Sequence, residues 1–245
     1  MLLLRRIGAF AGSLVYALAL TSCGGGGSSG SNGGTVPAAT PSPSSSTVVD
    51  GSAAPILLDE TPSTVIGDTS AFGTIVGAPG TATIDGQTCP AGATINTHYH
   101  VHLSLFVNGH QDAIPAGTGI YQPVVTFGPY FVEAGPNGCA YPVHVHALLG
   151  MLHIESAQAN AVLTLGDFLD IWGKSLSANG FGPFSAATRW FDADETGGAA
   201  GSHPVTELTG TDPHAINLVD HHEYTIEVGP TYVPIPNYTW SPYYP

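Results

Sequence analysis

Basic side chains are almost missing from this chain. Its 245 residues include four lysines and arginines against 18 aspartates and glutamates. After Arg5 and Arg6 the only basic residues are Lys174 and Arg189, whereas every acidic residue lies beyond residue 22. Nucleic acid and anionic membrane surfaces bind proteins through clustered positive charge, so the composition excludes them as electrostatic partners. It favours cations, although solubility outside the cell explains the negative charge equally well.

Long hydrophobic runs are also scarce. The apolar run at residues 7–20 is too short to cross a bilayer comfortably, and it follows two arginines as in a secretory signal. It ends in Leu20-Thr21-Ser22-Cys23, which resembles a bacterial lipobox. That resemblance implies a signal peptide at residues 1–22 and lipidation of Cys23, whose acyl chains would hold the protein at a membrane. The alternative is an ordinary cleaved signal with a cysteine nearby.

Core-forming residues are missing from the segment that follows. Residues 23–52 are mostly Gly, Ser, Pro and Thr, which cannot bury enough apolar surface to offset chain entropy. We therefore predict a disordered tether at residues 23–52 and a histidine-rich β domain at residues 53–230. A Tyr- and Pro-rich tail at residues 231–245 is expected to lie extended across that domain. The predicted location is the cell envelope, at the outer membrane, at the cell surface or on the periplasmic side.

Cysteine is rare, with only Cys89 and Cys139 remaining after Cys23. An oxidising compartment favours a disulfide between these two. The closed loop of about fifty residues would contribute roughly 4 kcal/mol in the chain-entropy model. The alternative is that one of the two cysteines is a copper ligand.

Histidine, in contrast, is concentrated. Six of the eleven histidines lie in two short segments, at residues 97–107 and 142–155, and recur mostly at every second position. Alternate side chains of a strand share one face of a sheet. The first segment therefore places His98, His100 and His102 together. In the second, a turn at residues 147–150 would oppose His144 to His153 and His146 to Met151, with Glu155 on the same face.

Imidazoles that converge from neighbouring strands bind transition metals. Zinc commonly takes three histidines and a water, and copper also prefers imidazole nitrogen. The spacing of His144, His146 and His153 is similar to the zinc site of α-type carbonic anhydrases, although the surrounding sequence does not match that family. We predict a copper or zinc site formed by these three residues and His98, His100 and His102. One ion and two ions both fit the pattern, and histidines that only pack or face solvent are the alternative.

Two further residues on the predicted histidine face have open roles. Glu155 is expected to orient a ligand or to act as a general base, or else to be a surface residue at a strand end. Met151 would favour Cu(I) as a thioether ligand, and core packing is the alternative.

The remaining pattern predicts a mostly β (α+β) domain. Strands are expected at residues 97–107, 111–114, 120–132, 187–193 and 222–228, with a tight hairpin at Asn108-Gly109. One helix is expected after Thr164, which with Asp167 forms a capping box. Its apolar stripe is Leu165, Phe168, Leu169, Trp172 and Leu176. The fold class is an antiparallel sheet or sandwich with one packed helix, a class consistent with 32 glycines and 20 prolines.

An ordered set of motifs runs through residues 85–229. It comprises HVHLSLFVNG at 100–109, HVH at 144–146 with HIES at 153–156, and TLGDF at 164–168 with IWG at 171–173. The set resembles an uncharacterised family of bacterial secreted proteins and lipoproteins. The resemblance implies the limits of the domain and no particular activity.

Three functions therefore remain open. We favour metal handling or sensing by a membrane-anchored protein whose partners are the metal ion and, through lipid, the membrane, with no nucleic acid and an unidentified protein partner. The enzyme alternative is a zinc-dependent hydrolase or hydratase with His144, His146 and His153 as ligands and Glu155 as catalytic base. The third alternative is a surface adhesion or assembly protein without metal.

Overall fold

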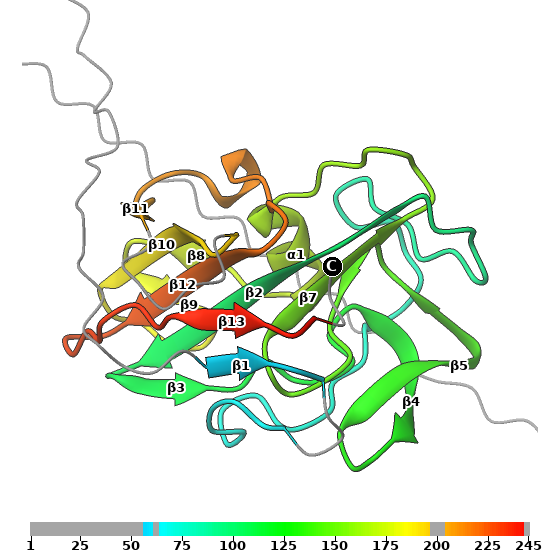
Figure 1. Cartoon of the computed structure of the whole chain (residues 1–245), viewed down its shortest axis with the longest axis horizontal. Helices are drawn as coiled ribbons and strands as arrows, with labels where there is room; N and C mark the ends of the chain where they lie inside the picture. Colours follow the sequence, from blue (N-terminus) through cyan, green and yellow to red (C-terminus); the bar gives the residue numbers. More distant parts are fainter. Residues whose placement is uncertain (1–55, 61–63, 197–203, 243–245) are drawn as a thin grey trace, which may run out of the picture. The chain divides into compact units, whose positions relative to one another are not determined.

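The computed structural model describes residues 56–60, 64–196 and 204–242 (Figure 1). The predicted signal peptide, the predicted lipidation site Cys23 and the predicted tether at residues 23–52 lie outside this part of the chain. Within it, no helix is both long enough and apolar enough to cross a bilayer.

A mixed β-sheet forms the centre of the domain (Figure 1). Its strands follow the order β11-β10-β12-β2-β7-β6, and β3 also pairs with β2. All of these pairs are antiparallel except β12–β2, which is parallel. The predicted mostly β fold with one packed helix is confirmed. The strand bounds are β2 Thr97–Val107, β3 His110–Asp112, β6 Val143–His144, β7 Met151–Ser156, β10 Thr188–Asp194, β11 Val205–Glu207 and β12 His222–Val228.

Three small two-stranded sheets accompany the main sheet. β4 (Ile120–Phe127) and β5 (Phe131–Ala140) form a hairpin where the sequence predicts one interrupted run. β8 (Leu176–Ser177) pairs with β9 (Gly180–Phe181). β1 (Ile56–Leu58) pairs in parallel with β13 (Tyr238–Trp240). The stretch after residue 230, predicted to be an extended tail, therefore supplies a strand and a buried residue, Tyr238.

The hairpin after β2 follows from its two central residues. Asn108 and Gly109 both have positive φ, at 51° and 81°. A two-residue turn of this kind matches the twist of antiparallel strands and favours Asn-Gly. Val107 therefore pairs directly with His110, and only the two turn residues separate β2 from β3.

The one α-helix of the described residues, α1 (Leu165–Trp172), begins as predicted. The Thr164 side chain accepts a hydrogen bond from the backbone N–H of Asp167, and the Asp167 carboxylate accepts one from the backbone N–H of Thr164. The helix ends at Trp172 and is capped by Gly173, whose φ of 68° is left-handed. The expected extension of the apolar stripe to Leu176 is therefore wrong, because that residue belongs to β8.

The main sheet has one face that packs against α1 and one that faces β1 and β13. On the first face Val101, Leu103 and Leu105 of β2 belong to the same core as Phe168 and Leu169 of α1. On the second, Met151 packs with Leu58 and Tyr238. The alternation of β2 places its three histidines on this second face, away from α1. Met151 belongs to the core, as in the packing alternative.

The predicted disulfide between Cys89 and Cys139 is present, with the two Cα atoms 5.4 Å apart. It connects the segment before β2 to the second-to-last residue of β5. Because both sulfurs are in the bond, the alternative in which one of these cysteines ligates copper does not apply.

Candidate metal centre

Three neighbouring strands bring most of the predicted histidines together. His98 pairs with Glu155, and His100 pairs with His153, between β2 and β7. His144 of β6 pairs with His153 from the other side, as predicted. The expected pairing of His146 with Met151 is wrong, because β6 ends at His144 and Met151 pairs with His102 instead.

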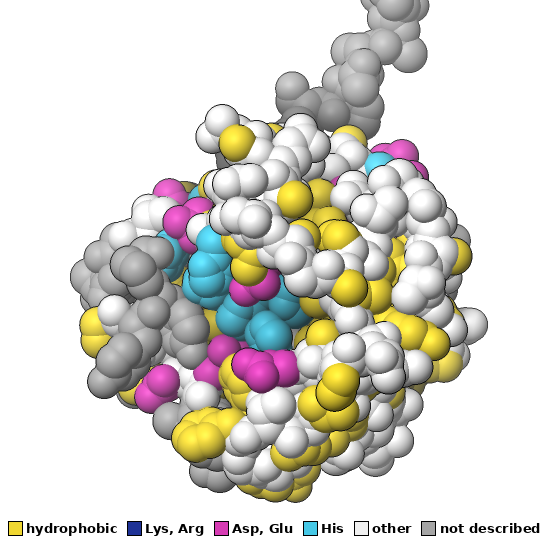
Figure 2. All heavy atoms as spheres, turned by 90° about the vertical axis from the view of Figure 1, so that its right-hand side faces the viewer, with side chains coloured by type: hydrophobic (Ala, Val, Ile, Leu, Met, Phe, Trp, Pro, Cys, Tyr) yellow, Lys and Arg dark blue, Asp and Glu magenta, His cyan; other side chains and the backbone are white. Residues whose placement is uncertain are grey.

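The rings of five histidines lie close together in space. His153 is central, since its ring centroid is 4.5 Å from that of His146, 4.6 Å from that of His100 and 5.8 Å from that of His144. Figure 2 shows histidine side chains gathered in a hollow with acidic side chains at its border. We call His98, His100, His144, His146 and His153, together with Glu155, the histidine cluster. Such convergence argues against the alternative of histidines dispersed over solvent-facing surfaces.

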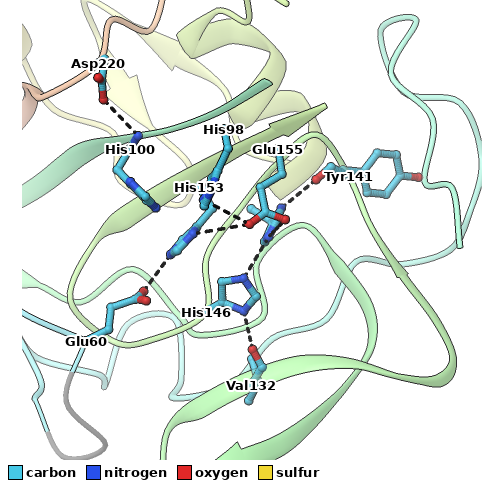
Figure 3. A network of polar contacts seen from close by, with 10 residues as sticks. Glu60, His98, His100, Val132, Tyr141, His146, His153, Glu155 and Asp220 are labelled. Atoms are coloured by element: carbon cyan, nitrogen blue, oxygen red, sulfur yellow. Dashed lines mark hydrogen bonds and ion pairs between the residues drawn. The ribbon is translucent and has the colours of Figure 1, made fainter. Parts of the chain in front are cut away.

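Backbone carbonyls fix the tautomers of two cluster members (Figure 3). The Nδ1 atom of His144 lies 2.8 Å from the carbonyl oxygen of Tyr141, and the Nδ1 atom of His146 lies 2.6 Å from that of Val132. A carbonyl oxygen only accepts, so both Nδ1 atoms carry hydrogen and donate. In the neutral rings both Nε2 atoms then carry lone pairs, and these two atoms are 3.1 Å apart.

A carboxylate fixes the tautomer of a third cluster histidine, His153. The Nε2 atom of His153 lies 2.9 Å from Oε1 of Glu60, so its N–H donates to the carboxylate. The opposite nitrogen, Nδ1, is buried and forms no hydrogen bond within the described residues. A histidine held by a carboxylate on one nitrogen, with a lone pair on the other, is the usual arrangement of a metal ligand.

The donor atoms fall into two sets. His98, His100 and His153 form one, and His144, His146 and Glu155 form the other, with the ligating atoms of each set within 4.8 Å of one another. Glu155 also lies near the first set. Its Oε1 is 3.4 Å from Nε2 of His98 and 3.9 Å from Nδ1 of His153, and its Oε2 is 3.8 Å from Nε2 of His144.

His102, the remaining predicted ligand, lies outside both sets. It is completely buried, its Nδ1 contacts the Glu223 carboxylate and its Nε2 contacts the carbonyl oxygen of Leu149. Both ring nitrogens are occupied by these oxygen contacts, so neither faces the cluster histidines. We therefore remove His102 from the ligand set.

Burial favours the neutral form of three cluster imidazoles. Desolvation, with smaller contributions from His153 and His98, lowers the pKa of His100 to about 3. Desolvation and the neighbouring rings also lower the pKa values of His144 and His153 well below the ordinary 6.5. Neutral imidazole is the form that ligates metal ions, so protons compete weakly for this site.

The lowered pKa values predict an acid-sensitive metal-free protein. Below pH 6.5 the unfolded chain binds protons that the folded protein rejects, so the free energy of unfolding falls as the pH drops toward about 3. The slope is about 1.4 kcal/mol per pH unit for each such histidine. Urea unfolding of chelator-treated protein at several pH values measures it. His100→Gln should reduce the slope by about one histidine's share, and an unchanged slope would show that His100 titrates normally.

A cavity of about 410 Å³ adjoins the cluster. His144 and Glu155 form part of its wall, and the disulfide contributes Cys139. Its other lining residues include Gln87, Thr88, Ile95, Tyr141 and Gln158. Among its lining residues there is no lysine or arginine, so the cavity offers neutral polar and apolar surface next to two candidate ligands.

Two contacts of the cluster have no signal in the sequence. Glu60 lies in a short segment after β1, far from both histidine runs, and Asp220 accepts a hydrogen bond from the backbone N–H of His100. Outside the cluster, His214 lies 3.2 Å from Asp85 and 3.5 Å from Asp170 in an exposed group.

Comparisons of the chain with protein-family models, with curated proteins and with solved structures gave no match. The resemblance to a family of bacterial secreted proteins and lipoproteins therefore stays a prediction, and the chemistry of the site rests on its own residues.

Proposed function

We propose that this protein binds a transition metal ion, copper or zinc, through the histidine cluster, and that it handles or senses that ion in the cell envelope. The observation that carries the proposal is the pair of Nε2 atoms of His144 and His146, 3.1 Å apart, each with its Nδ1 hydrogen committed to a backbone carbonyl.

Two lone pairs at this distance repel each other unless a cation lies between or beside them. A proton is one such cation, but burial opposes the protonation of His144. A metal ion is the other, and two ligands at the Zn–N distance of about 2.0–2.1 Å in a tetrahedron lie about 3.4 Å apart. The separation of the two nitrogens is close to this value, so the fixed tautomers favour a metal ion.

The donor types narrow the choice of ion. Cys89 and Cys139 are joined in the disulfide, and Met151 packs against Leu58 and Tyr238 in the core. The donors that remain are imidazole nitrogens and a carboxylate, a set that suits zinc and Cu(II) better than Cu(I).

Titration of metal-free protein with Zn²⁺ or Cu²⁺ by calorimetry tests the proposal. We expect saturable uptake, and we expect Glu60→Gln to weaken it about 10- to 100-fold, the usual effect of losing a carboxylate that orients a ligand. Glu133→Gln is the matched control, since Glu133 is an exposed residue of β5. No uptake by the unaltered protein contradicts the proposal.

We also propose that Cys23 anchors the protein to a membrane. Support comes from the sequence before it, an apolar run that ends in Leu-Thr-Ser-Cys. Cys23→Ala is expected to move the protein from the membrane fraction to the soluble fraction of the host cell. Labelling with a radioactive fatty acid checks the modification directly, and a Cys23→Ala protein that stays labelled and membrane-bound contradicts the anchor.

A second candidate function is a zinc-dependent hydrolase or hydratase. The observation in its favour is the cavity beside the cluster, which gives a substrate access to His144 and Glu155. Because no basic side chain lines the cavity, a neutral ester is the suitable probe. Zinc-loaded protein should cleave it in proportion to bound zinc, and Glu155→Gln should remove that activity. Equal rates with metal-loaded and metal-free protein contradict the enzyme function and leave metal binding intact.

A further inference from the structure

We infer that the histidine cluster holds two metal ions and that the Glu155 carboxylate bridges them. The inference rests on the proposed metal binding and adds the number of ions and the role of Glu155.

The number of donors exceeds the needs of one ion. A tetrahedral ion takes four ligands, and the cluster offers five imidazoles and a carboxylate. The histidine donors of the two sets come from different parts of the sheet. His98 and His100 come from β2 with His153 of β7 beside them, whereas His144 and His146 come from β6 and the bend that follows it. Each set supplies a separate centre.

Glu155 is placed to serve both sets. One of its oxygens, Oε1, faces His98 at 3.4 Å and His153 at 3.9 Å, and the other, Oε2, faces His144 at 3.8 Å (Figure 3). One oxygen directed to each set is the geometry of a bridging carboxylate. Ions in such two-metal sites are about 3.5–4 Å apart.

The local charge suits two cations. Glu155 and Glu60 both lie at the cluster, where their carboxylate oxygens face histidine nitrogens. Lys174 lies over the rings of Phe72 and Trp172, and Arg189 pairs with Glu207. The two carboxylates therefore give the cluster a negative charge, which favours cations. In this arrangement Glu155 is a ligand of both ions, which replaces its predicted role as a free base.

Copper titration distinguishes one ion from two. Chelator-treated protein is loaded with Cu²⁺, its copper content is measured by elemental analysis, and its electron paramagnetic resonance signal is integrated. We expect two copper ions per chain and a signal well below that of two isolated Cu(II) ions, because bridged ions couple. Saturation at one ion, or two ions that give the full uncoupled signal, overturns the inference. No uptake at all overturns the proposed function instead.

Variants assign the two ions to their ligands. Glu155→Gln cannot bridge, so any two ions that it binds should give an uncoupled signal. His98→Ala with His100→Ala should leave one ion with a full signal, and circular dichroism checks that this variant is folded. His214→Ala is the control, because it disrupts the exposed group with Asp85 and Asp170. It should keep two coupled ions, and loss of the second ion in this control overturns the inference, as does coupling that survives in Glu155→Gln.

Discussion

Replacing His144 and His146 together by alanine is expected to abolish the stabilisation that the metal ion bound by these two residues gives to this protein. An ion present at 1,000 times its dissociation constant stabilises a folded protein by about 4 kcal/mol. For a domain of 150–250 residues each kcal/mol raises the melting temperature by about 2–4 °C, so the unaltered protein should gain roughly 8–16 °C with Zn²⁺. The double variant removes the two lone pairs that face each other at 3.1 Å, so it should lose this gain and keep at most the gain from an ion at His98, His100 and His153.

Differential scanning calorimetry with and without Zn²⁺ measures both gains. His110→Ala is the control, since His110 is an exposed residue at the start of β3. It should retain the whole gain. A double variant that is stabilised by zinc as strongly as the control would place the ion elsewhere in the molecule.

Glu223→Ala is expected to destabilise the fold by about 3–5 kcal/mol, whatever the metal content. The Glu223 carboxylate and the His102 ring are both completely inaccessible to solvent and contact each other directly. Removing one member of a buried pair leaves the other without compensation, and losses of this size are typical. Thr225 also loses its contact with Glu223, which accepts a hydrogen bond from its hydroxyl at 3.1 Å.

Urea unfolding measures this effect, and a paired replacement separates charge from packing. His102→Leu with Glu223→Met removes both polar groups and should recover much of the lost stability, because apolar pairs of similar volume often replace buried ion pairs at little cost. Both variants should still take up metal, since His102 is not a ligand. A loss below about 1 kcal/mol for Glu223→Ala would mean that His102 is satisfied without its carboxylate.

Local signals in the sequence predict the elements around the site. The strand predicted from the alternating residues 97–107 coincides with β2, and Asn108-Gly109 forms the expected turn. Thr164 and Asp167 cap the helix as expected. Each of these features depends on residues within a few positions of one another, so one short stretch contains the whole cause.

Long-range contacts decide which histidines join the cluster, and no local pattern encodes them. His100 and His102 share a face of β2, yet only His100 belongs to the cluster. The difference is Glu223, which is 121 residues away and reaches His102 through the parallel pairing of β12 with β2. Glu60, which contacts His153, is likewise 93 residues away in the sequence, so no local pattern predicts that contact.

The turn predicted at residues 147–150, inside the second histidine segment, shows the same limit. Alternation predicts a regular hairpin, but the chain leaves the sheet after His144. The Val132 carbonyl of β5 then accepts the Nδ1 hydrogen of His146, so a neighbouring hairpin sets the direction of that ring. The sequence predicts the residues of the cluster better than their pairing.

Elemental analysis of the protein purified without chelators from the compartment in which it matures tests the central claim most directly. The claim is that imidazoles from neighbouring strands share metal ions. It predicts at least one equivalent of copper or zinc per chain, and one equivalent fewer in the variant that lacks His144 and His146. Protein that carries no metal, and that takes up none when copper or zinc is added, would contradict it.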